Sequence, residues 1–167
     1  MMNTLASALI PALAQLQATK PTDRETVLTR TFVAPLHSVF EALTRPESVV
    51  QWMKPPNMTL VECRIELRAG GSFRHVYQRA SGARIEVRGT YDAVDAPNRF
   101  AYTETYDFSP LRIHVTTTLD QVGAETVFKQ RMVYSSKEER DRDFDAVVSG
   151  ATAAYANLDR YLQSLGR

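Results

Sequence analysis

His75 is the side chain in this sequence whose type and setting most readily suggest acid–base chemistry. It shares one face of a predicted strand with Phe73 and Tyr77, because side chains along a strand alternate between its two faces. Imidazole titrates near neutral pH, so a histidine inside a cavity could act as a general acid or base. A purely structural or exposed histidine is the alternative. His37 and His114 occur in patterns that indicate surface positions.

Glu104 is the second candidate, because it lies between Tyr102 and Tyr106 on one face of another predicted strand. A carboxylate between two phenols is costly to bury unless it is hydrogen-bonded, and such clusters are where perturbed pKa values are expected. If this face points inward, Glu104 could orient the polar group of a ligand or take a proton. If it points outward, Glu104 would pair with Arg112 or Lys129.

Gln130 and Trp52 are two further side chains with alternative roles. Gln130 alternates with Phe128 and Met132, so it is a lone amide on an apolar wall. It would contact a ligand, or it would be satisfied by the backbone or a buried water. Trp52 stands beside a Pro-Pro loop, where it would serve as a lid over a cavity or as a plain core aromatic.

No familiar catalytic motif accompanies these residues. The sequence has no Gly-rich phosphate loop, no HExxH, no CxxC and no G-x-S-x-G. Its one cysteine excludes an intramolecular disulfide, and 20 basic against 19 acidic residues argue against a nucleic-acid binder. We therefore assign no catalytic residue, expect no metal or cofactor, and leave open whether the protein is an enzyme.

The elements that must position these residues follow the order strand, two short helices, six strands, long helix. Proline at 35 and at 46 marks the start of each short helix. Ser136 to Glu139 form a capping box, which begins a helix of about 29 residues, or roughly 44 Å. The predicted strands cover residues 25–33, 59–67, 72–78, 84–94, 100–108, 113–119 and 126–133.

Six consecutive strands with short turns must pair as an antiparallel meander, and one face of that sheet must be covered. The final helix is the one element long enough to cover it. The sequence thus predicts an α+β protein, in which a curved antiparallel sheet of about seven strands surrounds the long C-terminal helix. Gly150 and Ala151, near the middle of the helix, would leave room for a small molecule.

Several local strings, in this order, resemble the START-like (SRPBCC, helix-grip) superfamily and, within it, the family of the activator of the heat-shock-protein-90 ATPase. The resemblance covers residues 23 to 165. This fold hosts lipid carriers, hormone receptors, polyketide cyclases and co-chaperone modules. The strings are Val33-Ala34-Pro35 with Val39-Phe40, Pro46-Glu47 with Gln51-Trp52, Leu67-Arg68-Ala69-Gly70-Gly71, Gly89-Thr90-Tyr91, Ala96-Pro97-Asn98-Arg99-Phe100, Thr103-Glu104, Ser136-Lys137-Glu138-Glu139-Arg140-Asp141, and Gly150 followed by Tyr155, Leu158 and Leu162.

The fold that the resemblance implies predicts a ligand cavity between the sheet and the C-terminal helix. We expect it to bind a small hydrophobic or aromatic molecule. The alternatives are a cofactor-independent cyclase or hydrolase that uses His75, Glu104 and a tyrosine, and a chaperone-interaction module. The predicted cavity residues are Trp52, Phe73, His75, Tyr77, Tyr102, Glu104, Tyr106, Phe128, Gln130, Met132, Phe144, Val148, Ala151 and Tyr155.

Residues 1–22 are predicted to form a helical arm that precedes a helix-grip domain at 23–167. Its apolar stretch from Leu5 to Ala14 is too short to span a bilayer and follows an opening without Lys or Arg, unlike a secretory signal. We therefore expect a cytoplasmic protein. The leucines of the arm need cover, so we also expect a homodimer.

Overall fold

The structure is a computed structural model, and it describes residues 15–166. Its two short helices are α2 (Leu36–Thr44) and α3 (Pro46–Trp52), and its long helix is α4 (Lys137–Leu165). The strands are β1 (Gln17–Thr19), β2 (Glu25–Phe32), β3 (Met58–Ile65), β4 (Ser72–Arg79), β5 (Arg84–Asp95), β6 (Arg99–Tyr106), β7 (Arg112–Val122) and β8 (Glu125–Val133).

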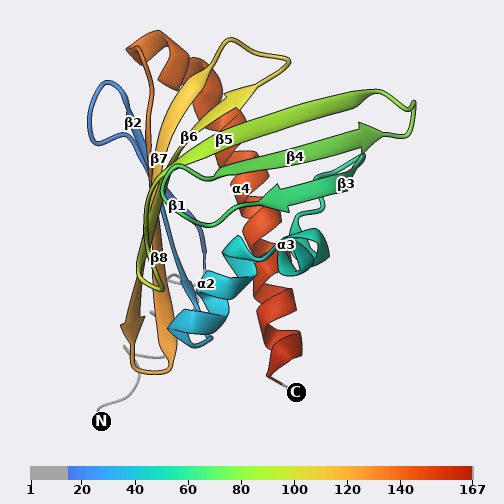
Figure 1. Ribbon diagram of the computed structural model, residues 1–167. Coiled ribbons are helices and arrows are strands. Elements are labelled where there is room, and N and C mark those ends of the chain that lie inside the picture. The colour runs from blue at the N-terminus through green and yellow to red at the C-terminus, as the bar shows by residue number, and fades with distance from the viewer. Residues whose placement is uncertain (1–14, 167) are drawn as a thin grey trace.

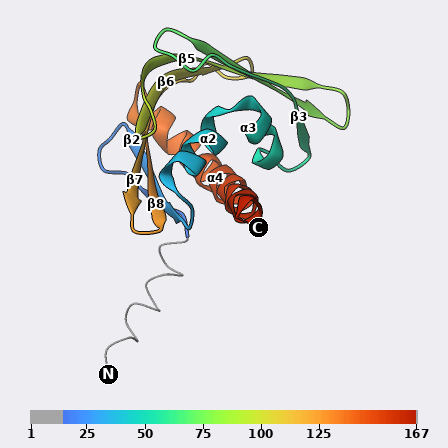
Figure 2. The same ribbon diagram turned by 60° about the horizontal axis from the view of Figure 1, so that its bottom comes forward.

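The described strands form one antiparallel sheet in the order β1-β2-β8-β7-β6-β5-β4-β3. From β3 to β8 every strand pairs with the next one along the chain, which is the meander that the short turns predict. The sheet curves around α4, and α2 and α3 lie inside the curve (Figures 1 and 2). The predicted α+β helix-grip fold is confirmed.

The first strand is the main departure from the predicted order. Residues 17–19 were expected in a helical arm, but they form β1 and pair antiparallel with β2, so the sheet has eight strands within the described residues. An edge strand of three residues has too little sequence to show an alternation. The remainder of the predicted arm at residues 1–14, including its apolar stretch, lies outside the described residues.

Helix α4 begins at the predicted capping box. The Ser136 side chain accepts a hydrogen bond from the backbone N–H of Glu139 at 3.2 Å. Nearby, the buried guanidinium of Arg140 donates to the carbonyls of Thr22 and Glu25, at 2.5 and 2.9 Å. These bonds tie the first turn of the helix to the segment that leads into β2.

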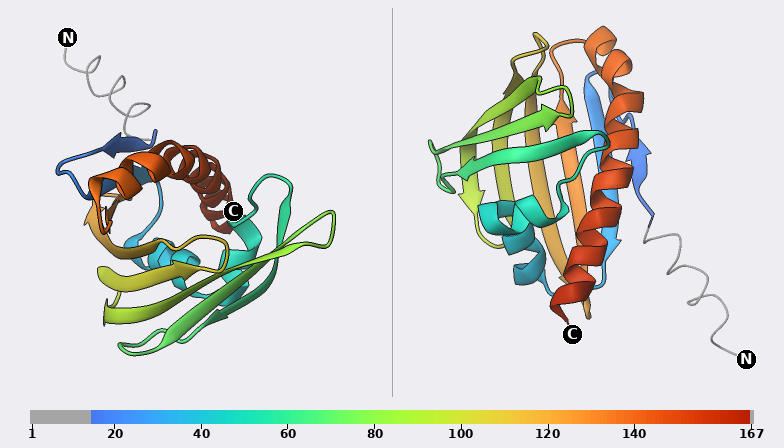
Figure 3. Two further views of the ribbon diagram at one scale, coloured as in Figure 1. Left: turned by 90° about the horizontal axis from the view of Figure 1, so that it is seen from above. Right: turned by 90° about the vertical axis from the view of Figure 1, so that its right-hand side faces the viewer.

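Helix α4 runs beside the curved sheet (Figure 3), and most of its buried residues lie in its second half. Its buried apolar residues are Tyr155, Leu158 and Leu162, whereas positions 141 to 154 are exposed or only half-buried. The ring of Tyr155 packs against Phe32 and Phe128, with centroids 6.3 and 4.9 Å apart. The middle of the helix is therefore held at a distance from β4 and β5. Within residues 15–166, no helix combines the length and the apolar character needed to cross a bilayer.

Candidate functional site

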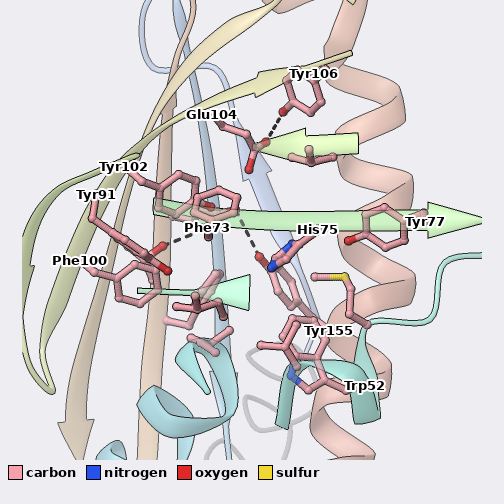
Figure 4. Close-up of a pocket in the computed structure, with 18 residues that line it drawn as sticks. Trp52, Phe73, His75, Tyr77, Tyr91, Phe100, Tyr102, Glu104, Tyr106 and Tyr155 are labelled. Carbon is pink, nitrogen blue, oxygen red and sulfur yellow. Dashed lines mark hydrogen bonds between the residues drawn. The ribbon is translucent and has the colours of Figure 1, made fainter. Parts of the chain in front are cut away.

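A cavity of about 260 Å³ lies between the concave face of the sheet, α3 and α4 (Figure 4). Its walls are mostly aromatic and aliphatic, with a few polar groups among them, as in small-molecule pockets generally. The lining residues are Leu43, Val49, Trp52, Met53, Ile65, Phe73, His75, Tyr77, Val87, Tyr91, Phe100, Tyr102, Glu104, Tyr106, Thr117, Phe128, Gln130 and Tyr155.

Strand alternation brings the two candidate clusters to the same wall. On β4 the inward positions include Phe73 and His75, and on β6 they include Glu104 and Tyr106. Strand β5 lies between them, so His75 and Tyr106 both pair with Val87, from opposite sides. The phenol of Tyr106 is thus two strands away from the imidazole in the same row of the sheet.

Glu104 faces the cavity and not the outer surface. The hydroxyl of Tyr106 donates a hydrogen bond to its carboxyl oxygen Oε1 (Figure 4). Burial raises the pKa of Glu104 to about 7, and the hydrogen bond from Tyr106 opposes that rise. The predicted alternative, an outward carboxylate paired with Arg112 or Lys129, is wrong. A carboxyl with a pKa near neutral is able to exchange a proton at physiological pH.

Four phenols that line the cavity lie close enough to Glu104 to sense its charge. Burial raises their pKa values, and the negative charge on Glu104 adds to the rise in each of them. These phenols therefore stay protonated and serve as neutral hydrogen-bonding groups. They are Tyr77, Tyr102, Tyr106 and Tyr155.

His75 stands in the cavity wall with an unsatisfied ring nitrogen. Its ring lies 5.2 Å from Phe73 and 6.4 Å from Tyr77, centroid to centroid. Burial lowers the pKa of His75 to about 4, so the imidazole is neutral at physiological pH. Its Nε2 atom is buried and has no hydrogen-bond partner among the described residues. Because an unsatisfied buried nitrogen is costly, it marks a place where a ligand would supply the missing partner.

Gln130 is satisfied by its neighbours across the cavity. Its Oε1 accepts a hydrogen bond from the hydroxyl of Tyr155 at 3.2 Å, and its Nε2 donates to Thr117 at 3.4 Å. The indole N–H of Trp52 donates to the carbonyl of Ala42 at 2.8 Å, and Trp52 is 3% exposed. Trp52 is therefore both a core aromatic and a wall of the cavity, which removes the choice between the two roles.

Ten of the predicted cavity residues line the cavity, and four do not. Met132 is closed off within the hydrophobic core, and Val148 is half-buried against it. Phe144 faces the N-terminal segment, where the ammonium of Lys20 lies 4.4 Å from its ring centre. Phe144 lies away from the cavity because the first turns of α4 are bonded to the segment that joins β1 to β2. Ala151 instead lines a second hollow.

Sequence reasoning missed eight lining residues. Strand alternation could have identified three of them. Phe100 lies on the same face of β6 as Tyr102, and Val87 and Tyr91 on β5 pair with the predicted residues His75 and Tyr102. The others reach the cavity through tertiary packing that no local pattern reports. They are Leu43, Val49, Met53, Ile65 and Thr117.

The second hollow is a groove of about 290 Å³ between the middle of α4 and the turn that follows α3. Tyr77 and Tyr155 line both the groove and the cavity, so the two hollows adjoin. Among the described residues, no cluster of His, Cys, Asp and Glu is arranged to hold a metal ion.

Solved structures with this fold share most of the length of the chain. A protein from Rhodobacter sphaeroides aligns with a TM-score of 0.87 and 25% identity, over 90% of this chain and 99% of its own. Protein NE0264 from Nitrosomonas europaea aligns with a TM-score of 0.78 and 20% identity, over 87% and 98%. Protein Ms6760 from Mycobacterium smegmatis gives 0.77 and 21%, over 89% and 98%.

No curated protein matches the chain. A family model does match, over residues 33–163, which is most of the chain and includes every element from α2 to the last turns of α4. The agreement in sequence and in the arrangement of sheet and helix leads to one assignment. The chain belongs to the family described as Activator of Hsp90 ATPase homolog 1-like protein, a family of the START-like type.

Proposed function

We propose that this protein binds a small, neutral, largely aromatic molecule in the cavity between the sheet and α4. The observation that carries the proposal is the unsatisfied Nε2 of His75, which stands in a wall made mostly of aromatic and aliphatic side chains. A hydroxyl or carbonyl group on a ligand would satisfy that nitrogen. The family supports either ligand binding or a chaperone-activator module, and the cavity favours the first.

The electrostatics of the cavity support a neutral ligand. Among the described residues that line it, none is Lys or Arg, and one is a carboxylic acid. An anionic ligand would therefore be buried without a counter-charge and next to Glu104. A phenol or alcohol has the same apolar body without that penalty.

Calorimetric titration with 2-naphthol, together with thermal unfolding, tests the proposal. A ligand present at 100 times its Kd should raise stability by about 2.7 kcal/mol, which is roughly 5–11 °C in Tm for a domain of this size. The variant His75→Phe removes the polar partner and narrows the cavity, so it should bind far more weakly. The variant His114→Phe changes an exposed histidine outside the cavity and should bind as the wild type does. A wild-type protein that binds no neutral aromatic molecule would overturn the proposal.

A second candidate is a cofactor-independent enzyme, and Glu104 is the observation that favours it. Its carboxyl has a pKa of about 7, it is hydrogen-bonded by Tyr106, and it shares the cavity with His75. Two titratable groups that line one cavity are the starting point for acid–base catalysis, which also requires both to reach the reacting atoms of one bound molecule. Molecules that bind should be incubated with the wild type and with Glu104→Gln, and their products analysed by mass spectrometry. Turnover by the wild type alone would support catalysis.

A further inference from the structure

We propose that the groove between α4 and the Pro55-Pro56 turn receives the apolar tail of the ligand, whose ring lies in the cavity. This inference rests on the proposed function and narrows the ligand to a ring with an alkyl substituent. The groove is lined by Met53, Pro55, Pro56, Met58, Tyr77, Ile85, Gly150, Ala151, Ala153, Ala154 and Tyr155.

The groove continues the cavity, because the side chains of Met53, Tyr77 and Tyr155 line both hollows. Tyr77, from β4, and Tyr155, from α4, stand where the two hollows meet. On β4, His75 lies two residues beyond Tyr77 and lines the cavity but not the groove. Two residues span roughly 7 Å along a strand. A ring that reaches His75 therefore has its opposite end near Tyr77, where the groove begins.

The helix side of the groove is kept open by small residues. Gly150, Ala151, Ala153 and Ala154 lie on consecutive turns of α4 and offer no side chain that could fill the space. A Cβ atom added at Gly150 would meet nothing within 4 Å, so tight packing does not require a glycine there. Glycine within a helix is less stable than alanine, and a need to keep the groove open would explain its presence at position 150.

The other walls of the groove favour an apolar occupant. Among the described residues that line it, none carries a charge, and Met53 and Met58 are flexible side chains that adapt to alkyl chains. A charged tail would find no counter-charge among these residues. The groove and the cavity together therefore fit a molecule with one polar ring and one apolar chain.

A series of 4-alkylphenols with ethyl, butyl and hexyl chains tests this inference by calorimetric titration. Each methylene that enters the groove should tighten binding about fourfold, the effect expected for its burial. Ala151→Phe should fill the groove and make the three Kd values nearly equal. Ala146→Phe is the matched control, because Ala146 is exposed on the same helix and lines neither hollow. It should keep the full dependence on chain length.

The outcomes separate this inference from the proposed function. If 4-ethylphenol binds the wild type but longer chains bind no tighter, the groove is not the tail site and only this inference is overturned. The same holds if Ala151→Phe keeps the chain-length dependence. If no alkylphenol binds the wild type, this inference is overturned, and the proposed function is overturned with it only if 2-naphthol also fails to bind. Should Ala151→Phe fail to fold, Gly150→Leu replaces it, because its Cβ enters open space.

Discussion

Gly89 on β5 lies directly opposite Phe73 on β4, and the Phe73 ring occupies the space that a side chain at position 89 would need. An added Cβ atom would stand 2.0 Å from Cε1 of Phe73. The ring lies across β5 toward Tyr102, with centroids 5.1 Å apart in an edge-to-face arrangement. Because Gly89 has no side chain, the Phe73 ring can lie over β5, where it forms one wall of the cavity.

Gly89→Ala should therefore destabilise the protein by about 1–3 kcal/mol, as overpacking a tight site does. The Phe73 ring must turn away, and the wall of the cavity moves with it. Urea unfolding measures the change in free energy. Gly150→Ala is the control, since it adds a methyl group at an open helical position and should stabilise by about 1 kcal/mol. Equal effects in the two variants would contradict the close approach at Gly89.

Glu104 should make the protein less stable as pH rises. Its pKa is raised from 4.5 to about 7 in the folded state, so the folded protein holds this proton between those values while the unfolded chain releases it. The stability present below pH 4.5 is therefore lost as pH rises through 7, by about 3 kcal/mol.

The variant Glu104→Gln has no ionisable group at position 104, so its stability should not fall in this way as pH rises. Urea unfolding at pH 5 and pH 8 measures this loss: the variant should gain about 2.5 kcal/mol relative to the wild type between the two pH values. The same comparison with Glu138→Gln, at an exposed position on α4, should show no comparable gain. A constant difference between Glu104→Gln and the wild type would contradict a buried, protonated Glu104.

His75 should have the opposite pH dependence. Burial lowers its pKa from 6.5 to about 4, so the stability that it contributes above pH 6.5 is lost as pH falls through 4. NMR of the three histidines follows each ring directly. The His75 signal should stay that of a neutral imidazole down to about pH 5. A midpoint near 6.5 would show a histidine open to bulk water.

Much of this arrangement could be predicted from strand alternation and helix spacing. The alternation at Phe73, His75 and Tyr77 predicts one shared face, and all three residues line the cavity. Alternation reports which residues share a face but not whether that face points inward, so the direction of Glu104 stayed open. In the structure Glu104 pairs with Gly89, which pairs in turn with Phe73, so Glu104 and Phe73 lie in one row of the sheet and both face the cavity.

Prediction from the sequence failed for residues whose position depends on tertiary packing and not on the local pattern. The apolar stripe of α4 predicted Phe144 and Val148 in the cavity, but a stripe does not show which part of the sheet each turn meets. The buried Arg140 donates to the carbonyls of Thr22 and Glu25, and these bonds hold the first turn of α4 against the segment that leads into β2. Arg140 stands among several other charged residues in the sequence, so no local pattern predicts that its side chain is buried.

The fluorescence of Trp52 tests the central claim most directly, because it is the only tryptophan of the chain and lines the cavity. The protein is titrated at pH 7 with 4-hexylphenol and with octanoate, with free N-acetyltryptophanamide as the control for collisional quenching. The neutral phenol should give a saturable change that His75→Phe weakens, and octanoate should give none, because the described residues of the lining include no cation to pair with it. Saturable binding of octanoate equal to that of the phenol, or no response to either, would contradict a cavity built for neutral ligands.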